Sequence, residues 1–150
     1  MNKILFLCTG NYYRSRYAEI LFNWHGAQRG LEWKAESRGL QPDPRNPGPL
    51  SRHTMAALEQ LNIPFSSHLR LPLLVTEEDF RTAQHVVAVK EAEHRPMMER
   101  LFPQWQDRVE FWHVHDVDCV GPEVALPELE REMELLVTRL QNNSAVLASL

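Results

Sequence analysis

The stretch that decides the fold is Lys3-Ile4-Leu5-Phe6-Leu7-Cys8-Thr9-Gly10-Asn11-Tyr12-Tyr13-Arg14-Ser15. Residues 3–7 carry a continuous apolar run from Ile4 to Leu7, which is typical of a short strand buried in a parallel sheet. The turn-forming residues Thr9, Gly10 and Asn11 follow this strand and end it. From Ser15 to about Gly30 apolar residues return at helical spacing, and Ser15 is the expected N-cap. The first thirty residues therefore predict a strand, a glycine-containing turn and a helix.

The rest of the chain repeats this alternation of strands and helices. We expect further strands at 33–37, 85–89 and 109–114, helices at 52–61, 91–102 and 127–147, a capped helical turn at 76–79, and an irregular loop at 41–49. Pro127 suits the first turn of the last helix, where its missing N–H costs nothing. Such alternation indicates βαβ units. We predict an α/β fold in one domain over residues 1–150, a three-layer sandwich around a four-stranded parallel, doubly wound sheet.

Composition excludes several classes of protein. A hydrophobic content of 43% with 24% charged residues fits an ordinary globular chain. The net charge of −4 argues against a general nucleic-acid binder. Two cysteines make no disulfide framework, which favours a reducing compartment. No stretch reaches the roughly 7–15 apolar residues of a secretion signal or the roughly 20 of a membrane span. We therefore expect a cytoplasmic protein without nucleic-acid or membrane partners, and no pattern indicates its oligomeric state.

The segment from Cys8 to Ser15 lies where parallel sheets bind ligands, at the carboxyl end of a strand and beside a helix N-terminus. Backbone N–H groups of such a loop converge on an anion, and Arg14 can fork onto two phosphate oxygens. A thiol so placed is suited to nucleophilic attack on bound phosphorus. A cysteine at a strand end is otherwise most often a small buried hydrophobe. The joint pattern of strand, C-x5-R-S and helix start favours a nucleophile.

Residues 8–15 resemble the C-x-G-N-x-C-R-S signature of low-molecular-weight protein tyrosine phosphatases, which directly follows the first strand in that family. Weaker resemblances lie at residues 36–39, at 66–68, and at 112–116, where the family's catalytic aspartate follows a strand. The resemblance implies a flavodoxin-like fold and a hydrolase of phosphate monoesters. It also implies a phosphorylated protein or small phosphoester as substrate, with no cofactor and no metal; no histidine spacing in the chain indicates a metal site.

Carried over residue by residue, the resemblance implies three catalytic residues. Cys8 would be the nucleophile that forms a phosphocysteine, Arg14 the phosphate clamp, and Asp116 the general acid and base. The loop residues expected to bind substrate are Thr9, Gly10, Asn11, Tyr12, Tyr13 and Ser15. The expected hydrogen-bond shell that supports the loop is Asn11, Ser15, Ser37 and His68.

The chain departs from the family pattern in four places. Val117 replaces the proline after the catalytic aspartate, so Asp118 is a rival for the role of acid. Tyr13 replaces the second cysteine, which can protect the nucleophile as a disulfide. Cys119 would substitute for it only if its loop covers the site. Lys90 replaces an acidic residue after the third strand, and the aromatic pair that follows the aspartate is absent.

Tyr12 occupies the family's variable position and would wall the pocket against an aromatic leaving group. In the family's bacterial arginine phosphatases a small threonine holds this position, so Tyr12 favours phosphotyrosine over phosphoarginine. Two alternatives are an arsenate reductase that uses an external thiol and a non-catalytic module that binds oxyanions or phosphoproteins. The thioredoxin-coupled reductases need cysteines that the chain lacks between Cys8 and Cys119. Retention of both Cys8 and Arg14 favours an enzyme over a binding module.

Overall fold

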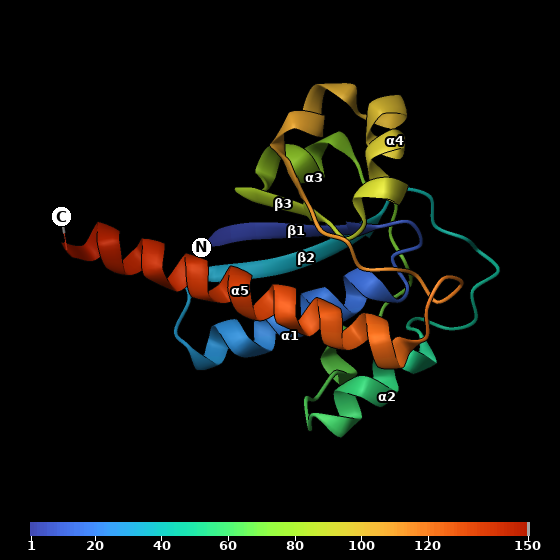
Figure 1. The fold of residues 1–150 in the computed structure, drawn as a ribbon, viewed down its shortest axis with the longest axis horizontal. Coiled ribbons are helices and arrows are strands. Elements are labelled where there is room, and N and C mark those ends of the chain that lie inside the picture. The colour runs from blue at the N-terminus through green and yellow to red at the C-terminus, as the bar shows by residue number, and fades with distance from the viewer. Residues whose placement is uncertain (150) are drawn as a thin grey trace.

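A four-stranded parallel sheet organises the chain, of which the computed structural model describes residues 1–149. Its strand order is β2-β1-β3-β4 (Figure 1). The elements in chain order are β1 (Asn2–Cys8), α1 (Arg14–Gln28), β2 (Trp33–Gly39), α2 (Arg52–Gln60), the 3-10 turn η1 (Ser66–His68), α3 (Glu77–Thr82), β3 (His85–Ala88), α4 (Glu91–Leu101), the 3-10 turn η2 (Pro103–Arg108), β4 (Val109–Phe111) and α5 (Pro122–Ser149).

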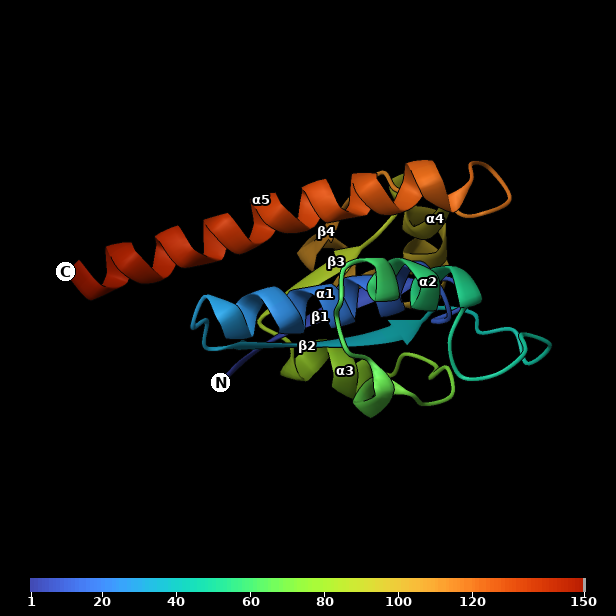
Figure 2. The same cartoon turned by 90° about the horizontal axis from the view of Figure 1, so that it is seen from below.

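Alternate residues of β1 build two cores, one on each face of the sheet. Ile4 and Phe6 join a cluster with apolar residues of α1, α2 and α5, whereas Leu5 and Leu7 join one with residues of α3 and α4. Figures 1 and 2 show α5 running beside α1 on the first face, and α3 and α4 lie on the second. The prediction of a three-layer, doubly wound α/β fold is therefore confirmed. Within the described residues no helix is both long and apolar enough to cross a bilayer.

Two predicted helix starts are wrong. Helix α1 begins at Arg14, its N-cap is Tyr13, and no side chain caps it. Ser15 lies inside the helix because its hydroxyl has a tertiary partner, the Cys8 thiol. Helix α5 begins at Pro122, so the N-terminal proline is that residue and Pro127 lies within the helix.

Other element boundaries shift for local reasons. The predicted strand at 109–114 ends at Phe111 because its partner β3 ends opposite, at Ala88. The predicted turn at 76–79 extends into α3, and the expected capping box is present between Thr76 and Asp79. The sequence did not predict η1 and η2, since short 3-10 segments lack a helical repeat long enough to recognise.

Gly39 brings the end of β2 against the loop that follows β1. A Cβ atom at this position would lie 2.8 Å from the backbone oxygen of Thr9 and 3.1 Å from the Cβ of Asn11. Backbone atoms cannot move aside as a flexible side chain can, so only glycine fits here without displacing the loop. The carboxyl end of the sheet therefore fixes the position of residues 9–11.

Replacing Gly39 by alanine should lower the free energy of unfolding by about 1–3 kcal/mol, because the new methyl group overlaps the Thr9 carbonyl. Urea unfolding of the purified variant measures this change. Gly26→Ala is the matched control: its Cβ would make only ordinary contacts within α1, and alanine there should raise stability by about 0.5 kcal/mol. Equal effects of the two substitutions would contradict the close-approach interpretation.

Candidate active site

The loop between β1 and α1, residues 9–13, borders a cavity of about 510 Å³ at the carboxyl end of the sheet. The cavity joins this loop to the segment at residues 46–55 and to the connection between β4 and α5. Of the residues predicted from the sequence, those that line it are Cys8, Gly10, Tyr12, Tyr13, Arg14 and Asp116. Side chains that are about a hundred positions apart in the chain therefore meet in one site.

Cys8 lines this cavity and is almost fully buried. Its sulfur accepts the backbone N–H of Asn11 at 3.2 Å and lies 2.9 Å from the hydroxyl oxygen of Ser15. The same Ser15 oxygen accepts an N–H from the Asn11 amide at 2.9 Å, which leaves the serine proton for the sulfur. Two donors thus converge on the sulfur, an arrangement suited to a nucleophile.

Asn11 is the only residue of the loop in the left-handed region, with a φ of 51°. Its side-chain amide nitrogen donates to the hydroxyls of Ser15 and Ser37, both at 2.9 Å. Its amide oxygen accepts the Leu73 backbone N–H at 3.0 Å and an Arg70 N–H at 2.9 Å. The neighbouring Gly10 does not adopt a left-handed conformation. Asparagine tolerates that conformation, and the four hydrogen bonds of its side chain stabilise it here.

Arg14 is 1% exposed, and its guanidinium has three partners. It donates to the Val114 carbonyl at 3.0 Å and to the Glu93 carboxylate at 2.9 Å, and an Asp116 oxygen lies 3.3 Å away. Burial disfavours its charge, but Cys8, Glu93 and Asp116 outweigh burial and raise the pKa of Arg14 above its ordinary value. The cation is therefore held firmly beside the cavity.

Glu93, in the first turn of α4, is a site residue that sequence reasoning missed. Its carboxylate accepts hydrogen bonds from Arg14 and from the Thr9 hydroxyl. It also lies 3.1 Å from Nε2 of the fully buried His94, whose Nδ1 accepts the Lys90 backbone N–H at 3.1 Å. That bond places the imidazole proton on Nε2, where it can be donated to Glu93. The acidic residue absent at Lys90 is thus supplied one helical turn later.

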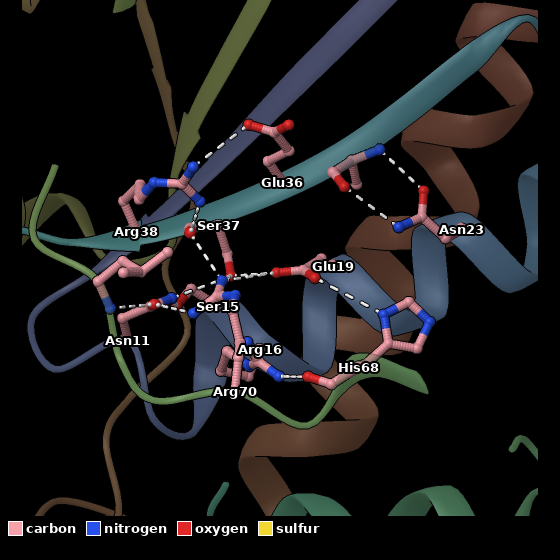
Figure 3. A network of polar contacts seen from close by, with 12 residues as sticks. Asn11, Ser15, Arg16, Glu19, Asn23, Glu36, Ser37, Arg38, His68 and Arg70 are labelled. Carbon is pink, nitrogen blue, oxygen red and sulfur yellow. Dashed lines mark hydrogen bonds and ion pairs between the residues drawn. The ribbon is translucent and has the colours of Figure 1, made fainter. Parts of the chain in front are cut away.

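The support expected from His68 comes from a different residue (Figure 3). Ser37 contacts Asn11 as predicted, but Nδ1 of His68 lies 3.7 Å from the Glu19 carboxylate and makes no contact with Asn11. Burial disfavours the ionised form of Glu19, yet the nearby His68 imidazole and the hydrogen bond from Ser37 hold its pKa below its usual value. His68 therefore reaches Asn11 only through Glu19 and then Ser37 or Arg70, and Arg70 occupies the place beside Asn11.

Three residues expected to bind substrate lie behind the cavity rather than in its wall: Thr9, Asn11 and Ser15. The Thr9 hydroxyl faces α4, and the other two support the thiol. Tyr12, in contrast, lines the cavity and donates its hydroxyl to the Pro47 carbonyl at 2.5 Å.

Tyr13 also lines the cavity, and its buried hydroxyl finds no hydrogen-bond partner within residues 1–149. Burial and the nearby Asp116 carboxylate raise the pKa of Tyr13 to about 12, so the hydroxyl keeps its proton at neutral pH. Asp118 and Cys119 are exposed and lie outside the cavity lining. The Cys119 sulfur lies 3.6 Å from the Lys90 ammonium. No group of three or more potential metal ligands gathers in the described part of the chain.

Comparisons with known proteins agree on one family. The family model described as low molecular weight phosphotyrosine protein phosphatase matches residues 3–144. A protein-arginine-phosphatase of Bacillus subtilis (strain 168) is 33% identical over 106 residues, which cover 71% of this chain and 67% of that protein. The crystal structure of YfkJ from Bacillus subtilis is 25% identical, with a TM-score of 0.82 and coverage of 95% and 96%. A low molecular weight protein tyrosine phosphatase from T. tengcongensis is 26% identical, with a TM-score of 0.75 and coverage of 95% and 99%.

The Glu93 carboxylate should make stability depend on pH. Burial disfavours its charge, but hydrogen bonds from His94 and Arg14 hold its pKa well below its usual value. Its contribution is therefore complete above the unfolded pKa of about 4.3 and is lost as pH falls through the lower folded value. Glu93→Gln should cost about 1–3 kcal/mol at pH 7, and the difference should shrink below pH 4.

Urea unfolding of both proteins between pH 3 and pH 8 measures this difference. Glu91→Gln is the control, because Glu91 belongs to an exposed pair with Arg95 on the same helix. That substitution should change stability by less than about 1 kcal/mol at every pH. A Glu93→Gln difference that stays constant over the whole range would contradict the prediction.

Proposed function

Because the chain belongs to the low molecular weight phosphotyrosine protein phosphatase family, we propose that it hydrolyses phosphate monoesters, protein phosphotyrosine foremost, through a phosphocysteine on Cys8. The observation that carries this proposal is the meeting of the Cys8 thiol, the Arg14 guanidinium and the Asp116 carboxyl in one cavity. These three groups supply a nucleophile, a clamp for the phosphoryl oxygens and a proton donor.

In the first proposed step the Cys8 sulfur attacks phosphorus as the bond to the ester oxygen breaks. Protonated Asp116 gives its proton to the departing oxygen, which leaves as an alcohol or phenol. Arg14 and the loop N–H groups stabilise the charge on the equatorial phosphoryl oxygens. Bonds to Val114 and Glu93 use two of the five guanidinium N–H groups, so donors remain for the phosphoryl group.

In the second proposed step water attacks the phosphocysteine. Asp116, now ionised, accepts a proton from that water, the S–P bond breaks, and inorganic phosphate and the Cys8 thiolate are released. The position of Asp116 supports this role: it lines the cavity and lies beside Arg14, whereas Asp118 does neither.

The wall of the cavity supports an aromatic substrate. The bond from Tyr12 to Pro47 fixes the tyrosine ring at one side, and Leu50, His53 and Met55 line the cavity with it. Phosphoarginine is the second candidate substrate, because the curated relative from Bacillus subtilis is a protein-arginine-phosphatase. Tyr12 stands where the family's arginine phosphatases have a small threonine, which favours the aromatic substrate.

Substrate preference can be measured with matched peptides that carry phosphotyrosine or phosphoarginine. We expect kcat/KM to be at least about tenfold higher for phosphotyrosine, and Tyr12→Thr should reduce that ratio by about tenfold because it removes the ring that walls the cavity. Cys8→Ser is the inactive control, with a loss of at least about 1,000-fold. A wild-type preference for phosphoarginine would overturn the proposed substrate while leaving the phosphatase activity in place.

The identity of the acid is tested by comparing Asp116→Asn with Asp118→Asn on an alkyl phosphate, whose leaving group needs a proton. We expect kcat to fall about 100-fold or more in the first variant and less than about threefold in the second. With p-nitrophenyl phosphate, whose leaving group is a weaker base, the loss in Asp116→Asn should be smaller. The reverse ranking of the two variants would assign the acid to Asp118.

A further inference from the structure

We propose that Arg70 is a positioning residue for the nucleophile, and that it acts on Cys8 through Asn11 and Ser15. This inference rests on the proposed function only in taking Cys8 as the nucleophile. Arg70 lies in the segment between η1 and α3, and its guanidinium lies within the polar network of Figure 3.

The Arg70 side chain is held by an unusually complete set of acceptors. One terminal nitrogen donates to the Asn11 amide oxygen at 2.9 Å and to the Leu71 carbonyl at 3.0 Å. The other donates to the Ser37 carbonyl at 3.0 Å, the Ser37 hydroxyl at 3.2 Å and the Glu19 carboxylate at 3.2 Å. A guanidinium with this many partners is fixed in direction as well as in place.

Arg70 determines which way the Asn11 amide faces. Arginine and a backbone N–H can only donate, so Arg70 and the Leu73 N–H together require the amide oxygen on their side. The amide N–H groups are then directed at Ser15 and Ser37. The Ser15 hydroxyl oxygen then accepts an N–H from the amide, so the hydroxyl proton can point at the Cys8 sulfur, which lies 2.9 Å from that oxygen.

The reversed amide shows what Arg70 prevents. With the amide turned over, its N–H groups would face the donors of Arg70 and Leu73, and its oxygen would accept the Ser15 proton in place of the Cys8 sulfur. The positive charge of Arg70 adds to this preference, because a charge-assisted hydrogen bond polarises the bonds that follow it in a chain. His68 cannot replace Arg70 here, since its imidazole is turned to Glu19.

The test compares Arg70→Met, which keeps the length of the side chain but has no donor, with Arg70→Lys and with the control Arg38→Met. Arg38 and Arg70 line one surface depression and carry the same charge, and both donate to the Ser37 carbonyl. Arg38 otherwise pairs with Glu36 and Asp79 and does not touch Asn11, so it controls for the positive charge and for the bond to the Ser37 carbonyl. Two readouts are used on the full chain: the rate of Cys8 alkylation by iodoacetamide at pH 7, followed on the Cys8 peptide by mass spectrometry, and kcat and KM for p-nitrophenyl phosphate.

We expect Arg70→Met to slow alkylation and to lower kcat by about tenfold each, with KM changed less than about twofold, because the phosphate donors stay in place. Arg70→Lys should recover part of both rates, and Arg38→Met should match the wild type. In an Asn11→Gly background, which accepts the left-handed backbone but lacks the amide, Arg70→Met should have no further effect on alkylation.

Unchanged alkylation in Arg70→Met would overturn the proposal, as would an equal loss in Arg38→Met or an undiminished loss in the Asn11→Gly background. If Arg70→Met fails to fold, the rates of Arg70→Lys decide. Lysine has a single flexible ammonium nitrogen in place of the planar guanidinium, so wild-type rates in that variant would contradict a role for the guanidinium geometry. Alkylation needs no phosphate hydrolysis, so a chain inactive on every phosphoester would refute the proposed function and still test Arg70.

Discussion

The four hydrogen bonds of the Asn11 amide are the interaction on which the rest of the site depends. They join the β1–α1 loop to the end of β2, to the start of α1 and to the segment at residues 70–73. A buried amide left without partners would cost several kcal/mol, so the loop is stable only when all three neighbours are in place. The Cys8 thiol, the Arg70 guanidinium and the end of β2 are therefore joined through this one amide.

Much of the fold could be predicted because the decisive signals are local. The apolar run of β1 and the helical spacing of α1 follow each other within thirty residues, and the capping box at Thr76 lies within four. The errors occur where a tertiary contact or an equivalent residue competes with a local rule. Ser15 has the character of a cap but is bonded to Cys8, and a proline is favoured at a helix start without specifying whether 122 or 127 takes that place.

The residues of the candidate site also divide into those that the sequence indicated and those that it did not. Cys8 and Arg14 were predictable from the loop that follows β1, and the resemblance to the family added Asp116; parallel strands bring their carboxyl ends, and with them these residues, to one edge. Glu93 and Arg70 were not, because long side chains on other elements reach the loop and no sequence spacing records that reach. Whether His68 or Arg70 contacts Asn11 depends on how the chain leaves η1, and two basic residue types two positions apart do not reveal this.

The close contact between Gly39 and the Thr9 carbonyl, together with the Asn11 bonds, also has a thermodynamic consequence. The loop is already ordered in the folded chain, so an oxyanion that enters it finds its donors preorganised and loses little conformational entropy on binding. The conformational entropy cost of ordering the loop is therefore incurred when the chain folds, not when the ligand binds. Affinity for the ligand and global stability are thus linked here, and random substitution around residues 9–11 would be expected to weaken both together rather than exchange one for the other.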